Sequence, residues 1–317
     1  MLSPPFRPVI VVLGPTGSGK SELALCIAKH VQGEIINCDS IQVYRGLDIG
    51  SAKTTPQDRQ GVPHHLLDVI GPGEEISAGS YAQLARENIA DIQSRGMVPI
   101  VVGGTGFYLR ALLDGLSPAP GRNALLRQRL SKIANRRPAF LHRVLNRYDG
   151  AAAARIHPND TPKLIRAIEI TLLTGKAVTD AQAAPRLSLS GISMLKLGLD
   201  PDRKLLHRRL NQRAEWMFKN GLLEETRGLV ESGYEASSKP LQSLGYKHAL
   251  AVISGEQSFD SALLDCQTKT RQYAKRQMTW FRREPEVVWM HGFGDDAQVQ
   301  EKCISIIAAK SGNRQQT

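Results

Sequence analysis

Several features that define other classes of protein are scarce in this chain of 317 residues. The four cysteines, Cys26, Cys38, Cys266 and Cys303, are scattered, with no C-x-x-C pair and no Cys/His cluster. A disulfide framework or a zinc finger is therefore not expected, and a reducing compartment fits best. No apolar stretch approaches the length that spans a bilayer, and the first residues lack a signal-peptide pattern. We therefore expect a soluble cytoplasmic protein with no membrane partner.

Acidic residues are also in deficit, because 30 Asp and Glu face 41 Lys and Arg, which gives a net charge of +11. The deficit is concentrated in two segments. Gly115–Tyr148 contains no acidic residue and eight basic ones, and Lys269–Arg283 contains no acidic residue and six basic ones. The second segment also carries Tyr273, Trp280 and Phe281. A single charge run usually lies on a solvated face, but two acid-free basic segments with aromatic neighbours favour RNA as a partner.

The second basic segment has a further regularity. Arg271, Lys275 and Arg282 are spaced so that they share one face of a helix. This spacing predicts that their three cationic groups line one groove.

The clearest motif is Gly14-Pro15-Thr16-Gly17-Ser18-Gly19-Lys20-Ser21, which matches G-x-x-x-x-G-K-[ST]. It follows the apolar run Val9–Leu13 and precedes a helix-like segment, which is the context of a phosphate-binding loop (P-loop). Its glycines let backbone N–H groups converge on an anion, Lys20 can reach an outer phosphate, and Ser21 can hold Mg²⁺. A chance glycine-rich turn is the weaker interpretation. The motif leaves open whose phosphate is bound, so a P-loop kinase remains an alternative.

Short apolar runs alternate with helical stretches in the first part of the chain. We predict strands at Val9–Leu13, Glu34–Cys38 and Val98–Val102, and helices at Glu22–Lys29, Tyr81–Gln93 and Phe107–Leu113. Such alternation is typical of an α/β protein with a doubly wound parallel sheet, whose ligands gather at the carboxyl ends of the strands.

The character of the sequence changes after Gly115, where helical spacing replaces the alternation. We predict a helix at Pro162–Leu173 that stops at Gly175, a connecting loop at Ala177–Gly191, and a strand at Met194–Leu199. Long helices are expected at Lys204–Val230 and Ser261–Arg283. The expected organisation is a first part of the P-loop core at 1–114, a helical insertion at 115–190 that contacts RNA, and a second part of the core at 191–317.

Two clusters at predicted strand ends can carry chemistry. Asp39 can be a Mg²⁺ or water ligand, a proton acceptor for a nucleophile, or simply a turn residue. Gly103-Gly104-Thr105-Gly106 can form a tight turn or line a substrate channel, because glycine permits close approach.

Together these motifs resemble the tRNA dimethylallyltransferases, also called tRNA isopentenyltransferases, of the bacterial type. The resemblance runs in order along nearly the whole chain, through the P-loop, Asp39–Gly50, Pro63-His64-His65-Leu66, Gly103–Tyr108, His157-Pro158-Asn159-Asp160, Gly245-Tyr246-Lys247 and Ala274–Arg282. It implies Mg²⁺-dependent transfer of a dimethylallyl group from its diphosphate to the exocyclic amine of the adenosine 3′ of the anticodon. The expected substrates are tRNAs that read codons beginning with U, and we expect a monomer.

The resemblance also implies roles for individual residues. Asp39 would be the general base, Thr105 would position the base and diphosphate, and Lys20 would neutralise charge. The diphosphate would be bound by Gly14, Pro15, Thr16, Gly17, Ser18, Gly19, Lys20, Ser21 and Arg213, with Ser21 on Mg²⁺. The tRNA would be contacted by Asp39, Ser40, Ile41, Gln42, Thr105, Arg127, Pro162, Lys163, Leu164, Ile165, Arg166, Gln242, Ser243, Leu244, Gly245, Tyr246, Lys247, Lys275, Arg276 and Arg282.

The chain departs from the family pattern at two positions. Gly17 stands where alanine is frequent, and His248 stands where glutamate is usual after Gly245-Tyr246-Lys247. Two other classes of function stay open from sequence: a P-loop kinase, which leaves the basic insertion without a purpose, and a non-catalytic RNA-binding protein that uses a nucleotide as a switch.

Overall fold

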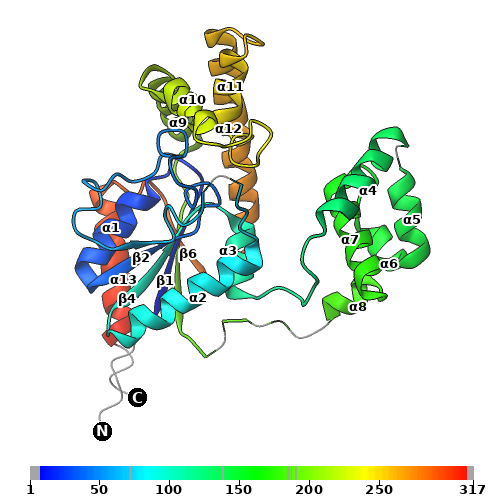
Figure 1. Ribbon diagram of the computed structural model, residues 1–317. Helices are drawn as coiled ribbons and strands as arrows, with labels where there is room; N and C mark the ends of the chain where they lie inside the picture. The colour runs from blue at the N-terminus through cyan, green and yellow to red at the C-terminus, as the bar shows by residue number, and fades with distance from the viewer. Residues whose placement is uncertain are drawn as a thin grey trace. The chain divides into compact units, whose positions relative to one another are not determined.

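The computed structural model describes residues 8–71, 73–137, 139–183, 186, 188–189 and 191–312. The chain divides into two compact units, one formed by residues 1–113 with 189–317 and the other by residues 114–188. Figure 1 shows the first unit as a sheet covered by helices and the second as a group of helices. None of the helices in the described part of the chain combines the length and apolar character needed to cross a membrane.

The first unit is built on a parallel sheet in the strand order β3-β2-β4-β1-β5-β6. The strands are β1 (Val9–Leu13), β2 (Gly33–Asn37), β3 (His64–His65), β4 (Val98–Val102), β5 (Met194–Leu199) and β6 (Val287–Met290). Apolar side chains fill both faces of β1 and β4, as expected for a sheet with helices on each side. This confirms the α/β fold with a parallel sheet.

Helices cover the two faces of this sheet (Figure 1). On one face, α1 (Lys20–Val31) and α13 (Ala297–Gly312) pack with Ile10, Leu197 and Cys303 in a continuous apolar core. Helices α2 (Ala78–Ser94) and α3 (Gly106–Leu113) pack against each other on the other side. The strand order reverses around β1, so the loop that follows β1 lies at the switch point where such sheets bind ligands.

Further helices stand beyond the carboxyl ends of the strands (Figure 1). They are α9 (Arg203–Lys219), α10 (Leu222–Glu231), α11 (Tyr246–Ile253) and α12 (Phe259–Phe281). The predicted single helix Lys204–Val230 is wrong, because the chain breaks between α9 and α10 at Gly221, whose φ of 103° is left-handed. Glycine adopts that conformation at little cost, and the break turns α10 away from the axis of α9.

The second unit consists of α4 (Ala124–Arg136), α5 (Phe140–Tyr148), α6 (Gly150–Arg155), α7 (Thr161–Thr174) and α8 (Val178–Ala183). Leu130, Leu145 and Ile168 lie in its apolar core. The side chain of Asp160 caps α7, and Gly175 ends it with a left-handed φ of 69°. The predicted loop at Ala177–Gly191 is wrong in its first part, where α8 forms; residues 184, 185, 187 and 190 lie outside the described residues.

Candidate functional site

The P-loop joins β1 to α1 and has the backbone shape of an anion site. Gly17 and Gly19 have left-handed φ values of 77° and 83°, and Gly19 is the N-cap of α1. A loop of this kind turns consecutive N–H groups inward, and the helix adds a partial positive charge at its start. At Gly17, a Cβ would stand 2.7 Å from Cδ2 of Leu210, so α9 packs tightly on the loop.

A loop near the C-terminus holds the P-loop from outside. The N–H of Gly294 donates to the carbonyl of Ser18 at 2.8 Å, and Asp295 pairs with Arg209 of α9 at 2.8 Å. A Cβ on Gly294 would stand 2.0 Å from the carbonyl oxygen of Gly19. Glycine at 294 therefore allows backbone to lie directly against the P-loop.

Lys20 and Ser21 begin α1, directly after the glycines of the P-loop. The Lys20 ammonium donates to the carbonyl of Pro15 at 2.8 Å and so rests on the loop itself. Burial lowers the pKa of Lys20 to about 8; nearby Asp39 raises this pKa and nearby Arg213 lowers it. Loss of solvation therefore makes the ammonium a strong partner for an anion.

Ser21 lines a small cavity of about 60 Å³ together with Lys20, Asn37, Asp39 and Gln42. The side chains of this cavity offer hydroxyl, carboxylate and amide oxygens, which are the ligands that Mg²⁺ prefers. No cluster of three or more His, Cys, Asp or Glu that could hold a metal occurs among the described residues. Mg²⁺ in a P-loop is held by the Ser/Thr hydroxyl and phosphate oxygens, so this residue set fits it.

Asp39 follows β2 and organises a turn at the carboxyl end of that strand. Its Oδ1 accepts hydrogen bonds from the N–H groups of Ile41 at 2.8 Å and Gln42 at 3.4 Å. The turn function anticipated from sequence is therefore real, but it occupies only one carboxylate oxygen. Asp39 also lines a larger cavity, so a carboxylate held by its own turn faces that space.

Thr105 fastens this turn to the end of β4. Its Oγ1 accepts from the N–H of Ser40 at 3.1 Å, and its own N–H donates to the carbonyl of Cys38 at 3.2 Å. A Cβ on Gly103 would stand 2.2 Å from the same Cys38 carbonyl oxygen, so glycine is needed there. Thr105 acts on Asp39 through the backbone beside it.

The larger cavity measures about 390 Å³. Thr16 of the P-loop, residues of the Asp39 turn and Arg213 give it polar lining, and Leu210, Ala214 and Met217 of α9 give it apolar lining. An anionic head and a small apolar group therefore find complementary surfaces in one space. The other lining residues are Ser40, Ile41, Gly50, Ser51, Gln242, Ser243, Leu244, Gly245, Lys247, Cys266, Thr270, Tyr273 and Arg276.

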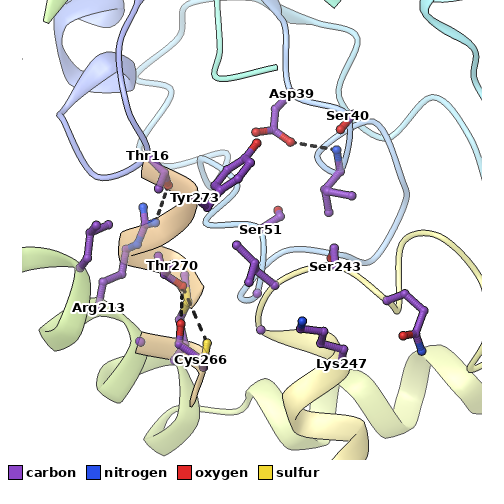
Figure 2. Close-up of a pocket in the computed structure, with 18 of the residues that line it drawn as sticks. Thr16, Asp39, Ser40, Ser51, Arg213, Ser243, Lys247, Cys266, Thr270 and Tyr273 are labelled. Atoms are coloured by element: carbon purple, nitrogen blue, oxygen red, sulfur yellow. Dashed lines mark hydrogen bonds between the residues drawn. The ribbon is translucent and has the colours of Figure 1, made fainter. Parts of the chain in front are cut away.

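Figure 2 shows how Arg213 and Tyr273 enter this cavity. The guanidinium of Arg213, on α9, donates to Oγ1 of Thr16 in the P-loop at 2.6 Å. Burial lowers the pKa of Arg213, with a further contribution from Arg209. Figure 2 shows the hydroxyl end of Tyr273 turned towards the carboxylate of Asp39, and burial followed by that carboxylate raises the pKa of Tyr273. Residues 197 positions apart thus meet at one site.

Gln277 of α12 was given no role from sequence, although it joins two loops of the site. Its Oε1 accepts from the N–H of Thr16 at 2.8 Å, and its Nε2 donates to the carbonyl of Gly104 at 2.8 Å. A Cβ on Gly104 would stand 2.3 Å from Nε2 of Gln277, and one on Gly106 would stand 2.5 Å from the ring of Trp280. The glycines of the 103–106 loop therefore admit side chains of α12.

The predicted groove of Arg271, Lys275 and Arg282 does not form. Arg271 donates to Oδ1 of Asn211 on α9 at 2.6 Å, and Arg282 caps the end of α12 and contacts Asp200 at 3.3 Å. Lys275 is exposed, and it is Arg276, stacked over Tyr273 at 5.8 Å, that lines the cavity. Helical spacing groups these residues by face, but Arg271 and Arg282 contact partners on different elements and so do not line one groove.

In the second unit, two predicted RNA-contacting arginines share a carboxylate. Arg127 and Arg166 contact Oε2 of Glu169 at 3.1 Å and 2.7 Å, and the N–H of Asn123 donates to its Oε1 at 2.7 Å. Glu169 is fully buried, which raises its pKa, but the hydrogen bonds from Arg166 and Asn123 outweigh burial and the pKa is lowered. Sequence reasoning missed Glu169, which orients both guanidinium groups.

Not every residue of the predicted tRNA-binding stretches can offer its side chain to RNA. Pro162 and Lys163 are exposed, but Leu164 and Ile165 are buried in the core of the second unit. Tyr246 is fully buried, and its hydroxyl donates to Glu225 at 2.6 Å. The side chains of Leu164, Ile165 and Tyr246 serve packing, so any contact of these residues with tRNA would come from their backbone.

The loop 240–245 leads into α11, and its residues Gln242–Gly245 line the larger cavity. At the start of α11, Nδ1 of His248 accepts the N–H of Gly245 at 3.3 Å. This is the backbone-accepting half of a capping box, in which the third helical residue is usually Glu or Gln. His248 therefore explains the departure noted in the sequence, since its ring nitrogen takes the place of a glutamate oxygen.

Comparison with known proteins matches this chain almost end to end. A profile of the family "IPP transferase" matches residues 42–284. A tRNA dimethylallyltransferase of Solibacter usitatus is 53% identical over 95% of this chain and 98% of the relative, and one of Koribacter versatilis is 52% identical over 94% and 97%.

Solved structures agree with these relatives. The tRNA isopentenylpyrophosphate transferase of Bacillus halodurans is similar with a TM-score of 0.73 and 34% identity, over 98% of each chain. A eukaryotic dimethylallyltransferase acting on tRNA has a TM-score of 0.83 and 28% identity, over 97% of this chain and 80% of that one. Because the family profile matches most of the chain and these relatives match nearly all of it, the chain belongs to the IPP transferase family, whose members compared above are tRNA-modifying prenyltransferases.

Proposed function

We propose that this chain transfers a dimethylallyl group from dimethylallyl diphosphate to the exocyclic amine of the adenosine 3′ of the anticodon, in tRNAs that read codons beginning with U. The products would be isopentenyladenosine and diphosphate. The observation that carries the proposal is that Thr16 of the P-loop, Arg213 and Asp39 line one cavity that also has apolar lining.

The P-loop side of the cavity suits a leaving diphosphate. As the C–O bond of the allylic donor breaks, negative charge develops on the departing oxygen and must be neutralised. Lys20 and Arg213 would neutralise this charge, and hydrogen bonds to Pro15 and Thr16 hold the two cations beside the loop. Mg²⁺, held by Ser21 and the phosphates, would supply additional charge neutralisation when bound.

The Asp39 side of the cavity suits the base. The adenine amine is a weak nucleophile, because its lone pair is delocalised into the ring. As it bonds to the allylic carbon it must lose a proton, and the Asp39 oxygen that its turn does not engage would accept that proton. Thr105 holds the backbone of Ser40 and so fixes the direction of the neighbouring carboxylate. Holding both reactants in one cavity adds the advantage of proximity.

A base enters such a cavity only when it leaves the stack of the anticodon loop, at a cost of a few kcal/mol. Exposed basic groups can offset that cost by binding RNA phosphates. The candidates are Lys163 and Arg166 in the second unit and Lys275 and Arg276 on α12, all half-buried or exposed.

The proposal is tested by incubating the protein with Mg²⁺, radiolabelled dimethylallyl diphosphate and unmodified tRNA, followed by mass spectrometry of the tRNA nucleosides. We expect label in one adenosine beside the anticodon. A matched tRNA with that adenosine replaced by guanosine should stay unlabelled. ATP-dependent phosphorylation of a small molecule without prenyl transfer would support a kinase and refute the proposal.

A further inference from the structure

The loop 242–245, which lines the cavity shared by Asp39 and Arg213, leads into α11 between two cavities. Gln242 and Lys247 line this cavity of about 390 Å³ and also a second cavity of about 720 Å³ on the other side of the loop. Residues that face two cavities have little packing behind them, so their position depends on a few specific hydrogen bonds. His248 lines only the second cavity and therefore approaches the loop from behind.

The hydrogen bond from Gly245 to His248 fixes the protonation state of the ring. A backbone N–H is always a donor, so Nδ1 of His248 must present a lone pair and the ring hydrogen must be on Nε2. Nε2 lies 3.3 Å from Oδ2 of Asp265 on α12, a contact whose alignment falls short of a good hydrogen bond. The same Gly245 N–H approaches the Cys266 thiol, which is a weak acceptor. The imidazole is therefore its principal partner.

We propose that neutral His248 is a positioning residue of the site: it holds Gly245 and the loop 242–245 against the cavity that Asp39 and Arg213 line, and its protonation releases that loop and weakens tRNA binding. Protonation places a hydrogen on Nδ1, so that two donors face each other and the hydrogen bond from the N–H of Gly245 is lost. The helix then loses its cap at the residue that joins it to the loop. This inference rests on the proposed function, because tRNA is the ligand that the loop would contact.

The surroundings of His248 set the direction of its titration. The side chain is almost fully buried, and this burial, with Lys247 as the next cause, lowers the pKa of His248, while Asp265 raises it and Lys269 lowers it. The second cavity also presents Arg227 and Glu231 of α10 and Glu256. Since the folded pKa lies below 6.5, the cap is intact at neutral pH and is lost as the pH falls through the lowered pKa.

His248→Gln tests the proposal, because a glutamine oxygen can accept the Gly245 N–H and its amide can face Asp265, but it does not titrate. At pH 7.5 we expect this variant to retain wild-type kcat and KM for tRNA. As the pH falls from 7.5 through the lowered pKa of His248, the KM of the wild type should rise roughly three- to tenfold, the range expected for loss of a helix cap. The Gln variant should lack that rise, and His248→Ala should show it at every pH.

Glu256→Gln is the matched control, since it changes a charge in the same cavity without touching Gly245. It should keep the pH profile of the wild type. If His248→Gln retains the acid-induced rise in KM, the proposal is overturned.

A second measurement separates this inference from the proposed function. The exchange protection factor of the Gly245 amide should fall in the wild type as the pH drops from 7.5 through the lowered pKa of His248, and should stay constant in His248→Gln. This is measured without tRNA, so it stands even if prenyl transfer is never observed. A protection factor that does not change in the wild type contradicts the inference.

Discussion

Replacing Asp39 by asparagine separates the two functions of this side chain. Oδ1 of Asp39 accepts the N–H groups of Ile41 and Gln42, and an asparagine oxygen can accept the same hydrogen bonds. The variant therefore keeps the turn that faces the cavity and removes only the charge and basicity. Asp39→Ala, by contrast, loses the turn as well.

The expected size of the effect follows from the proposed proton transfer. A positioned general base contributes about 10²- to 10⁴-fold to the rate, which corresponds to about 3 to 5 kcal/mol of activation free energy. We expect kcat of Asp39→Asn to fall by that factor and its Kd for tRNA to stay within about twofold of wild type. Single-turnover transfer with saturating labelled donor measures the first quantity, and fluorescence anisotropy with labelled tRNA measures the second.

The same variant carries an electrostatic consequence at Lys20. Asp39 raises the pKa of Lys20, which burial lowers to about 8, so removal of the carboxylate must lower that pKa further. The ammonium charge is lost as pH rises through this pKa. The alkaline limb of kcat/KM, which reports the free enzyme, should therefore lie near pH 8 in the wild type and at lower pH in Asp39→Asn.

Two results would refute this reasoning. A kcat for Asp39→Asn within threefold of wild type would show that Asp39 is not the base. An alkaline limb at the same pH in both proteins would show that Lys20 and Asp39 are not coupled. Asp39→Ala serves as the comparison, and it should weaken tRNA binding in addition to slowing transfer.

Three further predictions concern packing and charge. Gly104→Ala places a methyl group 2.3 Å from Nε2 of Gln277 and should lower the free energy of unfolding by about 1–3 kcal/mol in urea titration. Gly121→Ala, at an exposed position with no such contact and no left-handed φ, measures the effect of replacing a glycine alone. Glu169→Gln should lower the melting temperature at pH 7 but much less at pH 3. The folded pKa of this carboxyl is lowered, so its stabilisation is present above the unfolded pKa of 4.5 and is lost as the pH falls; equal losses at both pH values would contradict this. Arg213→Lys loses the planar guanidinium that donates to Thr16. It should raise the KM for dimethylallyl diphosphate about tenfold, or about 1.4 kcal/mol, and leave the Kd for tRNA unchanged; an unaltered KM would exclude Arg213 from the diphosphate site.

Features determined by local sequence were predictable. The P-loop between β1 and α1 was located from one motif, because its glycine conformations and the start of α1 are local properties. The stop of α7 at Gly175 was likewise local, since a left-handed residue ends a helix wherever it occurs. Both predictions needed no knowledge of distant contacts.

The errors arose where distant contacts or a single backbone angle decide the outcome. Apolar spacing continues across Gly221, so the sequence predicts one helix, but the left-handed φ of that residue divides it. Arg271 carries the same charge as Lys275, yet Asn211 of α9 binds the first and leaves the second exposed. Helical periodicity assigns a face but cannot say which neighbour meets it.

Gln277 illustrates the same limit at the site. It lies within a motif that pointed to RNA, and its residue type gives no sign that it binds the P-loop. Only the fold brings Thr16, 261 positions away, against it, and only the absence of a side chain at Gly104 admits its amide. A buried amide that satisfies two loops at once has a positional role that no local pattern encodes.

The electrostatics of the cavity argue that it is prepared for an anion. Lys20 and Arg213 are both stripped of part of their solvation, and Arg213 lowers the pKa of Lys20 further, so two cations are held together at a cost in free energy. Asp39 offsets part of that cost, but it is engaged in its own turn. A diphosphate bound between the cations would remove the repulsion and replace the lost solvation, so part of this cost in free energy would return as binding. As the donor bond breaks, negative charge grows at the same place, and the favourable interaction grows with it. Under the proposed function, the cationic pair would thus be better matched to departing diphosphate than to the intact donor, which is the condition for accelerating the transfer rather than merely binding its substrate.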